Sequence, residues 1–316
     1  MMFLLSVGIR FVYGWYCKIN FQECKIIMWV WDKSLLKRIF SFAGWNFIGA
    51  SSGVLRDQGT NVLLNIFCGP TVNAARGVAL QVSSAVTQFS SSFITAINPQ
   101  ITKNYANKEY EYLFKLVFDG ARFSVYLLLI MAYPILFETD MILSLWLKVV
   151  PPYTVVFVRL LLIYIIIESI SYTMVTLMLA TGNIRNYQIV VGGCQMLNFP
   201  ISYMLLKYNY SPETTIIASI IIAVGCLVLR LMMLHRMLNF PVSIFLKKVL
   251  GNILMVASIS LIVPLFLVNL MDSCILRVVL SILFTCMSTL WVILRLGCTD
   301  VERSFIIEKI ISKVKR

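Results

Sequence analysis

The sequence predicts an all-α integral membrane protein with eight transmembrane helices and an incomplete additional helix at the N-terminus. Hydrophobic residues make up 59% of the 316 residues, and the mean hydropathy is +0.86. Soluble globular chains are only about 45–50% apolar. Eight stretches each supply the roughly 20 mostly apolar residues that a spanning helix needs. Their predicted bounds are 38–68, 71–102, 113–137, 153–181, 184–206, 212–234, 249–270 and 274–297.

Positive charge alternates between successive connections of these spans, which also favours this fold class. One set of connections holds nearly all of the loop charge, and the other holds only Lys148 and Lys207. Because short cytoplasmic loops collect Lys and Arg, the first set is predicted to be cytoplasmic, including the 103–115 loop and the C-terminus. Its residues are Lys18, Lys25, Lys33, Lys37, Arg38, Lys103, Lys108, Lys115, Arg185, Arg236, Lys247, Lys248, Arg303, Lys309, Lys313, Lys315 and Arg316.

The two ends of the chain are predicted to flank the spans. Residues 1–16 are apolar but short, Arg10 interrupts them, and they lack the basic start and cleavage site of a signal peptide. We therefore expect 1–37 to be the end of a truncated helix and a cytoplasmic connection, in a C-terminal fragment of a longer protein. The tail 298–316 places apolar positions on one helix face, so we expect it to lie along the inner leaflet. Those positions are 301, 305, 306 and 310.

Composition argues against several function classes. The net charge of +13 lies in loops, where it sets topology and contacts anionic lipid headgroups, so no nucleic-acid partner is predicted. The eight cysteines show no CxxC spacing, and the single histidine, His235, lies at a predicted helix end. Zinc and other metal sites are therefore not predicted. No nucleophile–base pair, phosphate loop or large extramembrane loop occurs. These features predict transport without a cofactor, and not an enzyme.

The span 38–68 carries charge in its interior, at Arg56-Asp57-Gln58. Arg56 lies about 27 Å along a helix from Arg38, at about 1.5 Å per residue. A charge at that depth costs roughly 2.5–3.5 kcal/mol on insertion scales, so we expect it to face a wet cavity or a partner. Asp57 is placed to pair with it. One face of this helix is polar or small. Its members are Asn46, Gly49, Gly53, Arg56 and Thr60.

The span 71–102 carries an unbroken polar stripe at helical spacing, with Arg76 at its outer edge. Lipid cannot satisfy the hydrogen-bonding groups of such a stripe. Two interpretations are open, because small and polar residues can hold helices together and can also line a hydrophilic cavity. The length of the stripe and the two arginines favour a cavity. The stripe consists of Asn73, Gly77, Gln81, Ser84, Gln88, Ser92 and Thr95.

The span 153–181 contains Arg159 and Glu168, which are predicted to point to opposite faces. Arg159 lies near the outer end, where its long side chain can reach the interface. Glu168 is deeper, and a buried carboxylate that takes up a proton would suit ion coupling. A fixed hydrogen bond to a neighbouring helix is the equal alternative. The spans 212–234 and 249–270 have few polar residues and are interpreted as packing or lipid-facing helices.

Five segments carry recognisable motifs: SFAGWNFIG (41–49), LLNIFCGPTVNAARGVALQV (63–82), AINPQITKNYA (96–106), LSLWLKVVPPYT (143–154) and ATGNIRNYQIVVGG (180–193). In order and spacing they resemble the C-terminal half of bacterial polysaccharide-unit flippases. These belong to the multidrug/oligosaccharidyl-lipid/polysaccharide exporter superfamily. The resemblance covers about residues 1–316 and implies two six-helix lobes around a central cavity. The second lobe would be 38–237, and 238–297 would be two additional transmembrane helices.

The resemblance also implies a function and a set of residues. The family moves undecaprenyl-pyrophosphate-linked oligosaccharide across the bacterial inner membrane by alternating access, through a cationic cavity that suits the anionic headgroup. One lobe cannot enclose a substrate between two, so a second copy or a separate first-lobe polypeptide is expected as a partner. The expected substrate-binding residues are Arg56, Asp57, Gln58, Arg76, Gln81 and Gln88. The candidates for ion coupling are Asp57 and Glu168.

Three other functions are possible from the sequence alone. A drug or cation antiporter of the same superfamily should show more intramembrane carboxylates than arginines, and here Arg56 and Arg76 outweigh Asp57 and Glu168 only narrowly. A membrane-integral enzyme of glycan assembly usually places its chemistry in sizeable extramembrane loops, which this chain lacks. An inactive truncated fragment is the third alternative. The sugar unit and the coupling ion are not encoded in any motif of this sequence.

Overall fold

Helices account for every regular element in residues 2–21, 32–270 and 275–314, the part of the chain that the computed structural model describes. The chain divides into two units, Met1–Ser41 and Phe42–Arg316. The first unit contains α1, Met2–Asn20, so this helix continues beyond the predicted end of the apolar stretch at residue 16. It also contains the start of α2, Lys33–Cys68.

Asp32 caps the first turn of α2. Its Oδ1 accepts the backbone N–H of Ser34 at 2.8 Å and that of Leu35 at 3.2 Å. An aspartate at this position satisfies amides that have no partner within the helix. The bond from Leu35, followed by those from Ser34, holds the pKa of the Asp32 carboxyl below its ordinary value. The cap therefore fixes the start of α2 just before its predicted span.

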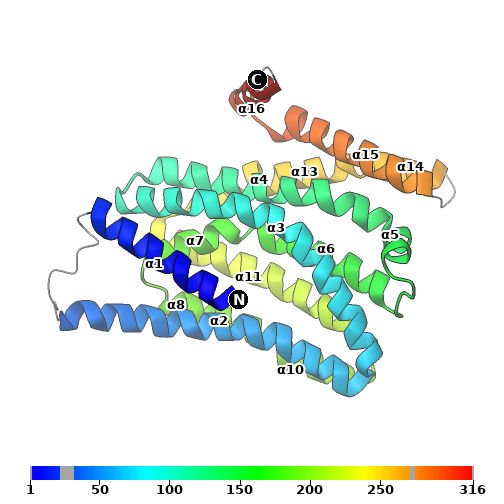
Figure 1. Ribbon diagram of the computed structural model, residues 1–316, viewed down its shortest axis with the longest axis horizontal. Coiled ribbons are helices and arrows are strands. Elements are labelled where there is room, and N and C mark those ends of the chain that lie inside the picture. Colours follow the sequence, from blue (N-terminus) through cyan, green and yellow to red (C-terminus); the bar gives the residue numbers. More distant parts are fainter. Residues whose placement is uncertain (1, 22–31, 271–274, 315–316) are drawn as a thin grey trace. The chain divides into compact units, whose positions relative to one another are not determined.

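The second unit is a bundle of long helices with short connecting turns, and Figure 1 shows several of them running side by side. Their bounds are α3 Pro70–Ala106, α4 Tyr110–Phe137, α5 Thr139–Trp146, α6 Thr154–Ser169, α7 Tyr172–Ala180, α8 Arg185–Tyr187, η2 Gln188–Gly192, α9 Gly193–Met196, α10 Asn198–Lys207, α11 Thr214–Leu238, α12 Val242–Phe245, η3 Leu246–Leu250, α13 Gly251–Ser260, α14 Ile262–Leu270, α15 Ile275–Val292, η4 Ile293–Gly297 and α16 Asp300–Val314.

Within the described ranges, five continuous helical stretches are long and apolar enough to cross a membrane, and the bent pair α6–α7 makes a sixth candidate. α2 and α3 have 36 and 37 residues, but their interior polar residues keep them outside this group. The structure thus confirms an all-α protein with membrane-length helices, while the count of eight spans stays a prediction. The five stretches are Tyr110–Phe137, Arg185–Lys207, Thr214–Leu238, Val242–Leu270 and Ile275–Gly297.

The helix α4 lies at the centre of the packing in the second unit. It contacts α3 and α6 along one side and α13 and α15 along another. Its side chains contribute to both apolar clusters of the unit, with Val117 and Val125 in one and Leu128 in the other. Because lipid is as apolar as these side chains, close packing and polar contacts, more than the hydrophobic effect, hold such helices together.

Several irregularities interrupt the predicted spans in the second unit, and two of them matter for the functional site. The span 153–181 is broken near Ile170, and its halves α6 and α7 are bent by 41°. The span 184–206 contains η2, a turn of π-helix, and such turns are frequent at functional sites. η2 also approaches α2 closely at Gly49, where a Cβ would lie 2.0 Å from the Gln188 Oε1. Both irregularities border the cavity described below.

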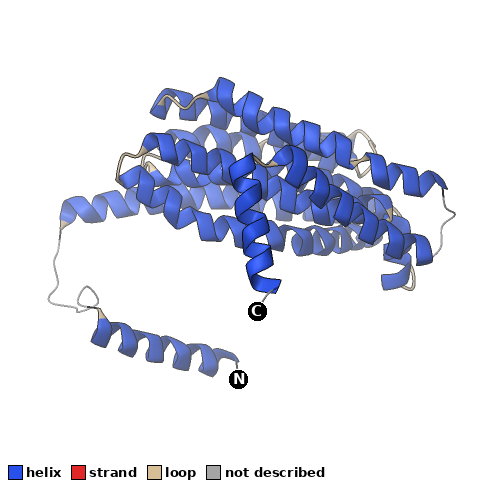
Figure 2. Cartoon of the chain, turned by 90° about the horizontal axis from the view of Figure 1, so that it is seen from above, coloured by secondary structure: helices blue, strands red, loops and turns tan. Residues whose placement is uncertain are grey.

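The tail helix α16 runs across the direction of the long helices, as Figure 2 shows. Val301 and Phe305 are exposed on it. The side chains of Ile306 and Ile310, the other two members of the predicted apolar face, lie outside the described residues. Contact of this helix with the inner leaflet therefore stays a prediction, although its direction is one that an interfacial helix would take.

Candidate functional site

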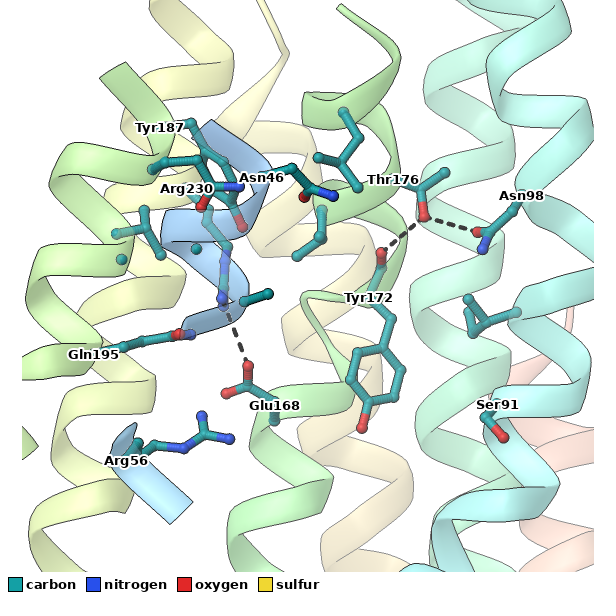
Figure 3. Close-up of a pocket in the computed structure, with 18 of the residues that line it drawn as sticks. Asn46, Arg56, Ser91, Asn98, Glu168, Tyr172, Thr176, Tyr187, Gln195 and Arg230 are labelled. Carbon is teal, nitrogen blue, oxygen red and sulfur yellow. Dashed lines mark hydrogen bonds and ion pairs between the residues drawn. The ribbon is translucent and has the colours of Figure 1, made fainter. Parts of the chain in front are cut away.

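A cavity of about 590 Å³ lies among the helices of the second unit. Its walls come from α2, α3, α6, α7, α8, η2, α9 and α11, so segments far apart in the sequence meet there (Figure 3). Most of the polar lining consists of amides and hydroxyls, of which Asn98 and Thr176 bond to each other at 2.7 Å. Asn46, Gln188 and Gln195 add further amides. Ligand pockets of about 300–1,000 Å³ are typical of small-molecule sites.

Three charged side chains line the cavity: Arg56, Glu168 and Arg230. The Glu168 Oε1 lies 3.5 Å from the Arg230 Nη2, and the two side chains are 17% and 2% exposed. In Figure 3 the Glu168 carboxylate lies between the guanidinium ends of Arg230 and Arg56. Glu168 sits at the end of α6, next to the break, so the bend in the span carries the charge into the cavity.

Arg56 pairs with Asp57, as the sequence predicted. Its Nε lies 3.0 Å from Asp57 Oδ1, and its Nη2 lies 3.1 Å from Oδ2, so two parallel bonds join the groups. The guanidinium also lies over the ring of Tyr164, 5.5 Å from its centroid. A carboxylate and an aromatic face both lower the cost of a charge inside the bilayer. Asp57 itself does not line the cavity.

Arg76 lies outside the cavity lining and joins α3 to α2. It is 5% exposed, and its Nη1 donates to the backbone carbonyl of Asp57 at 3.1 Å and to the side-chain oxygen of Asn61. Asn61 in turn donates to Gln58 Oε1 at 3.2 Å. The structure therefore brings Arg76 close to the Arg56–Asp57 pair through the backbone, without placing it at the cavity surface.

Gln81 and Gln88 are exposed and do not line the cavity. The same is true of most of the predicted stripe on α3, since Ser84, Ser92 and Thr95 are also exposed. Of these, only Thr95 reaches the cavity, where Thr87 and Ser91 of α3 also line the wall. Apart from Thr95, the exposed members of the stripe thus face away from the cavity.

The interpretation of the span 212–234 as a packing or lipid-facing helix was wrong at Arg230. This side chain projects from α11 into the cavity and is among the most buried in the molecule. A signal was present, because a single arginine within an otherwise apolar span carries the same cost as Arg56. The second such span, 249–270, also contributes a polar contact, from Asn252 Oδ1, which accepts the hydroxyl of Tyr126 at 2.7 Å.

On the predicted topology, one end of the cavity lies toward the cytoplasmic side of the membrane. Asn98 is about two turns from the end of α3, and Arg230 is about two turns from the end of α11, or roughly 12 Å in each case. Both helices end at connections rich in Lys and Arg. Gln188 lies just after the start of the next predicted span, beside Arg185.

Comparison with protein-family models, with curated proteins and with solved structures found no match to this chain. Within the described ranges, no three side chains of His, Cys, Asp and Glu are grouped to hold a metal ion. The chemistry of the site thus depends on two arginines, one glutamate and several neutral polar groups. Such a set can bind an anion reversibly by charge and hydrogen bonds.

Proposed function

We propose that this chain is a lobe of a membrane transporter that moves undecaprenyl-pyrophosphate-linked oligosaccharide units across the bacterial inner membrane by alternating access. The observation that carries this proposal is the cavity, with Arg56 and Arg230 projecting into it from membrane-length helices. Arginine presents a planar fork of donors that matches phosphate oxygens. Burying two of them around one hollow is costly unless an anion is their partner.

The local backbone supports transport over static binding. Glu168 borders a broken helix, and Gln188 begins a turn of π-helix. Transporters commonly place their sites near the midplane, where interrupted helices expose polar groups. The volume suits a pyrophosphate and part of one sugar, so the remainder of the oligosaccharide and the lipid chain would lie outside this hollow. We propose no catalytic step.

We propose that a second copy of this chain, or a separate first-lobe polypeptide, covers the exposed polar stripe of α3. Gln81, Ser84 and Gln88 lie on a membrane-length helix, where lipid cannot satisfy them. A facing lobe would supply their partners and close the substrate path, and membrane lipids would contact the remaining apolar surface. This arrangement also follows from the two-lobe family that the sequence resembles.

A drug or cation antiporter of the same superfamily is the second candidate function, because Glu168 faces the same cavity. A cationic substrate would pair with Glu168 and would be repelled by the two arginines. Export of surface polysaccharide and resistance to cationic dyes separate the two candidates. The flippase proposal requires the first activity and does not require the second.

The deciding experiment is complementation of a strain that lacks its polysaccharide-unit flippase, with the partner lobe co-expressed. We expect Arg56→Ala and Arg230→Ala to reduce surface polysaccharide by at least about tenfold, since each removes a charge-assisted contact. Arg56→Lys should recover only part of the activity, because an ammonium lacks the planar fork. Protein level in the membrane should not change. Normal export by both alanine variants would contradict the proposal.

The side of the cavity can be measured separately. The chain should be converted to a version without native cysteines, and a single cysteine should replace Asn107, which follows α3. An impermeant thiol reagent should label this site only after the membrane is opened. Labelling in intact spheroplasts would place the loop, and with it the cavity, on the outer side.

A further inference from the structure

Arg230 has more hydrogen-bonding capacity than its surroundings use. Its side chain is 2% exposed, and its Nε and Nη1 have no hydrogen-bond partner among the described residues. A guanidinium carries five N–H donors, and a buried donor left without an acceptor is costly. Tyr187 lies beside it in Figure 3, and Glu168 is its ion-pair partner. The Arg230 side chain therefore points into the cavity with N–H donors that no described residue uses.

The contact with Glu168 is loose. The Nη2–Oε1 distance of 3.5 Å exceeds the range of about 2.7–3.2 Å for a normal N–H···O bond. In the same chain, Arg122 and Glu302 approach to 2.6 Å. Glu168 thus compensates the charge of Arg230 without saturating its donors. Glu168 also lies beside the break at Ile170, where the hydrogen-bond pattern of the helix is interrupted.

We propose that Glu168 is a resident anion that holds the place of a phosphate group on Arg230 while the cavity is empty, and that a phosphate or pyrophosphate group displaces it. The three lining charges then sum to +1 when the site is empty, from Arg56, Arg230 and Glu168. A displaced Glu168 would free the Arg230 guanidinium for the incoming anion, beside the Arg56 guanidinium that Asp57 holds at the same cavity. This inference rests on the proposed function only for the identity of the cargo, because the exchange requires nothing but the anionic group.

The exchange makes Glu168 a competitor of the ligand, with a measurable consequence. Removing its charge at constant shape, in Glu168→Gln, should strengthen phosphate binding. A carboxylate that serves only as a structural anchor for Arg230 would have the opposite effect, because the arginine would lose its orientation. A carboxylate that serves only in ion coupling would leave anion affinity unchanged at constant pH. The sign of the change therefore separates the three roles.

The experiment uses the full chain in nanodiscs of neutral lipid, with inorganic pyrophosphate as the probe and calorimetry at fixed pH and ionic strength. We expect Glu168→Gln to bind at least about tenfold more tightly than the unsubstituted chain, since it frees the positive guanidinium of Arg230 for the anion. Arg230→Gln should bind at least about tenfold more weakly, for the converse reason. Asp140→Asn is the matched control, because it makes the same charge change outside the cavity. It should not alter binding.

The double variant Arg230→Gln with Glu168→Gln decides whether the gain in pyrophosphate affinity depends on the contact between Glu168 and Arg230. We expect no gain from Glu168→Gln in the Arg230→Gln background. An equal gain there, or no gain in the single variant, would overturn the inference. Glu168→Asp keeps the charge and should stay near the unsubstituted affinity, so it provides a second reading if Glu168→Gln folds poorly. Thermal unfolding of each variant verifies folding.

Two sources of phosphate can be separated with the same proteins. Nanodiscs that contain phosphatidylglycerol test a lipid headgroup as the occupant, since it would compete with pyrophosphate and lower its apparent affinity. An unchanged affinity would assign the site to the cargo. The complementation experiment tests the proposed function separately. If that function is wrong, export would be absent while Glu168→Gln still bound pyrophosphate more tightly. Export without that gain would reject the resident-anion inference alone.

Discussion

Two arginines of this chain are almost equally buried, and they are used in opposite ways. Arg122 on α4 is 7% exposed, and Arg230 on α11 is 2% exposed. The Nη2 of Arg122 lies 2.5 Å from Asp119 Oδ1 and 2.6 Å from Glu302 Oε1, and its Nη1 donates to the Gly297 carbonyl at 3.1 Å. Arg230 has one charged partner at 3.5 Å.

Around Arg122, side-chain and backbone contacts hold the tail helix α16 against α4. Glu302 also accepts the backbone N–H of Thr299 at 2.8 Å, and the Thr299 hydroxyl accepts that of Glu302 at 3.4 Å. This reciprocal capping box starts α16, so one carboxylate caps the tail helix and anchors it to α4. Gly297 lies against Tyr126, whose ring atoms would be 3.1 Å from an added Cβ.

The comparison teaches that burial of a charge does not by itself indicate its role. A buried arginine whose donors are matched by fixed acceptors holds helices together, as Arg122 does. A buried arginine with unused donors next to a cavity, such as Arg230, is a candidate for binding a ligand. The energetic cost of burying the guanidinium is offset within the fold in the first case. In the second case, an anion from outside the chain would be needed to offset that cost fully.

The largest expected effect is on stability, at Arg122. Arg122→Met should lower the free energy of unfolding by about 3 kcal/mol, because removing the buried arginine leaves two half-buried carboxylates uncompensated. Arg230→Met should lower it by only about 1 kcal/mol, since its partner is distant and open to the cavity. Thermal unfolding in detergent, monitored by tryptophan fluorescence, measures both. Equal losses of unfolding free energy in the two variants would show that the surroundings of Arg122 and Arg230 do not differ in this way.

Much of the cavity could be predicted from the sequence, because charge inside an apolar span is a strong signal. This signal identified Arg56 and Glu168 and the pairing of Arg56 with Asp57. It also existed at Arg230, but the apolar residues around it led to a packing interpretation. The periodicity of α3 predicted one polar face, yet periodicity cannot tell which neighbour that face meets. Gln88 on that face is exposed, while Asn98 lines the cavity.

Other features could not be predicted because they depend on contacts between distant segments. The break at Ser169-Ile170-Ser171 contains neither proline nor glycine, the residues at which helices usually bend. The ion pair that anchors the tail helix joins Arg122 to Glu302, which are 180 positions apart in the sequence. A capping box can be found in a sequence, but nothing in Thr299 or Glu302 indicates that the same carboxylate also reaches α4.

The second prediction tests the close approach of η2 to α2 at the cavity wall. Gly49→Ala would place a Cβ within 2.0 Å of Gln188 Oε1, whereas the same change at Gly53 on α2 meets nothing within 4 Å. Gly49→Ala should therefore destabilise by about 1–2 kcal/mol through overpacking. Gly53→Ala should stabilise by about 0.5 kcal/mol through helix propensity. Thermal unfolding compares the two, and equal melting temperatures would show that Gln188 moves aside without cost.

The third prediction concerns the cap of the tail helix. Thr299→Ala removes one half of the capping box and should cost about 1 kcal/mol of helix stability. The loss should be local, because Arg122 still holds Glu302. Limited proteolysis is expected to cut the tail faster in this variant, while cutting elsewhere is unchanged. Ser304→Ala, on the same helix, is the control, since its hydroxyl donates only to the Val301 carbonyl of the previous turn. Slow cutting of both would show that the cap is dispensable.

The smallest effect is expected at a third arginine, which lacks the burial of the other two. Arg159 pairs with Asp140 at 2.8 Å, but the side chains are 42% and 72% exposed. Such a pair contributes about 0–1 kcal/mol because water and salt screen it. Arg159→Ala should leave polysaccharide export near normal and should lower the melting temperature slightly at low salt and not at high salt. If export failed in Arg159→Ala as we expect it to fail in Arg230→Ala, exposure would not separate interface arginines from cavity arginines. The contrast between Arg122 and Arg230 would then need another cause than the completeness of their contacts.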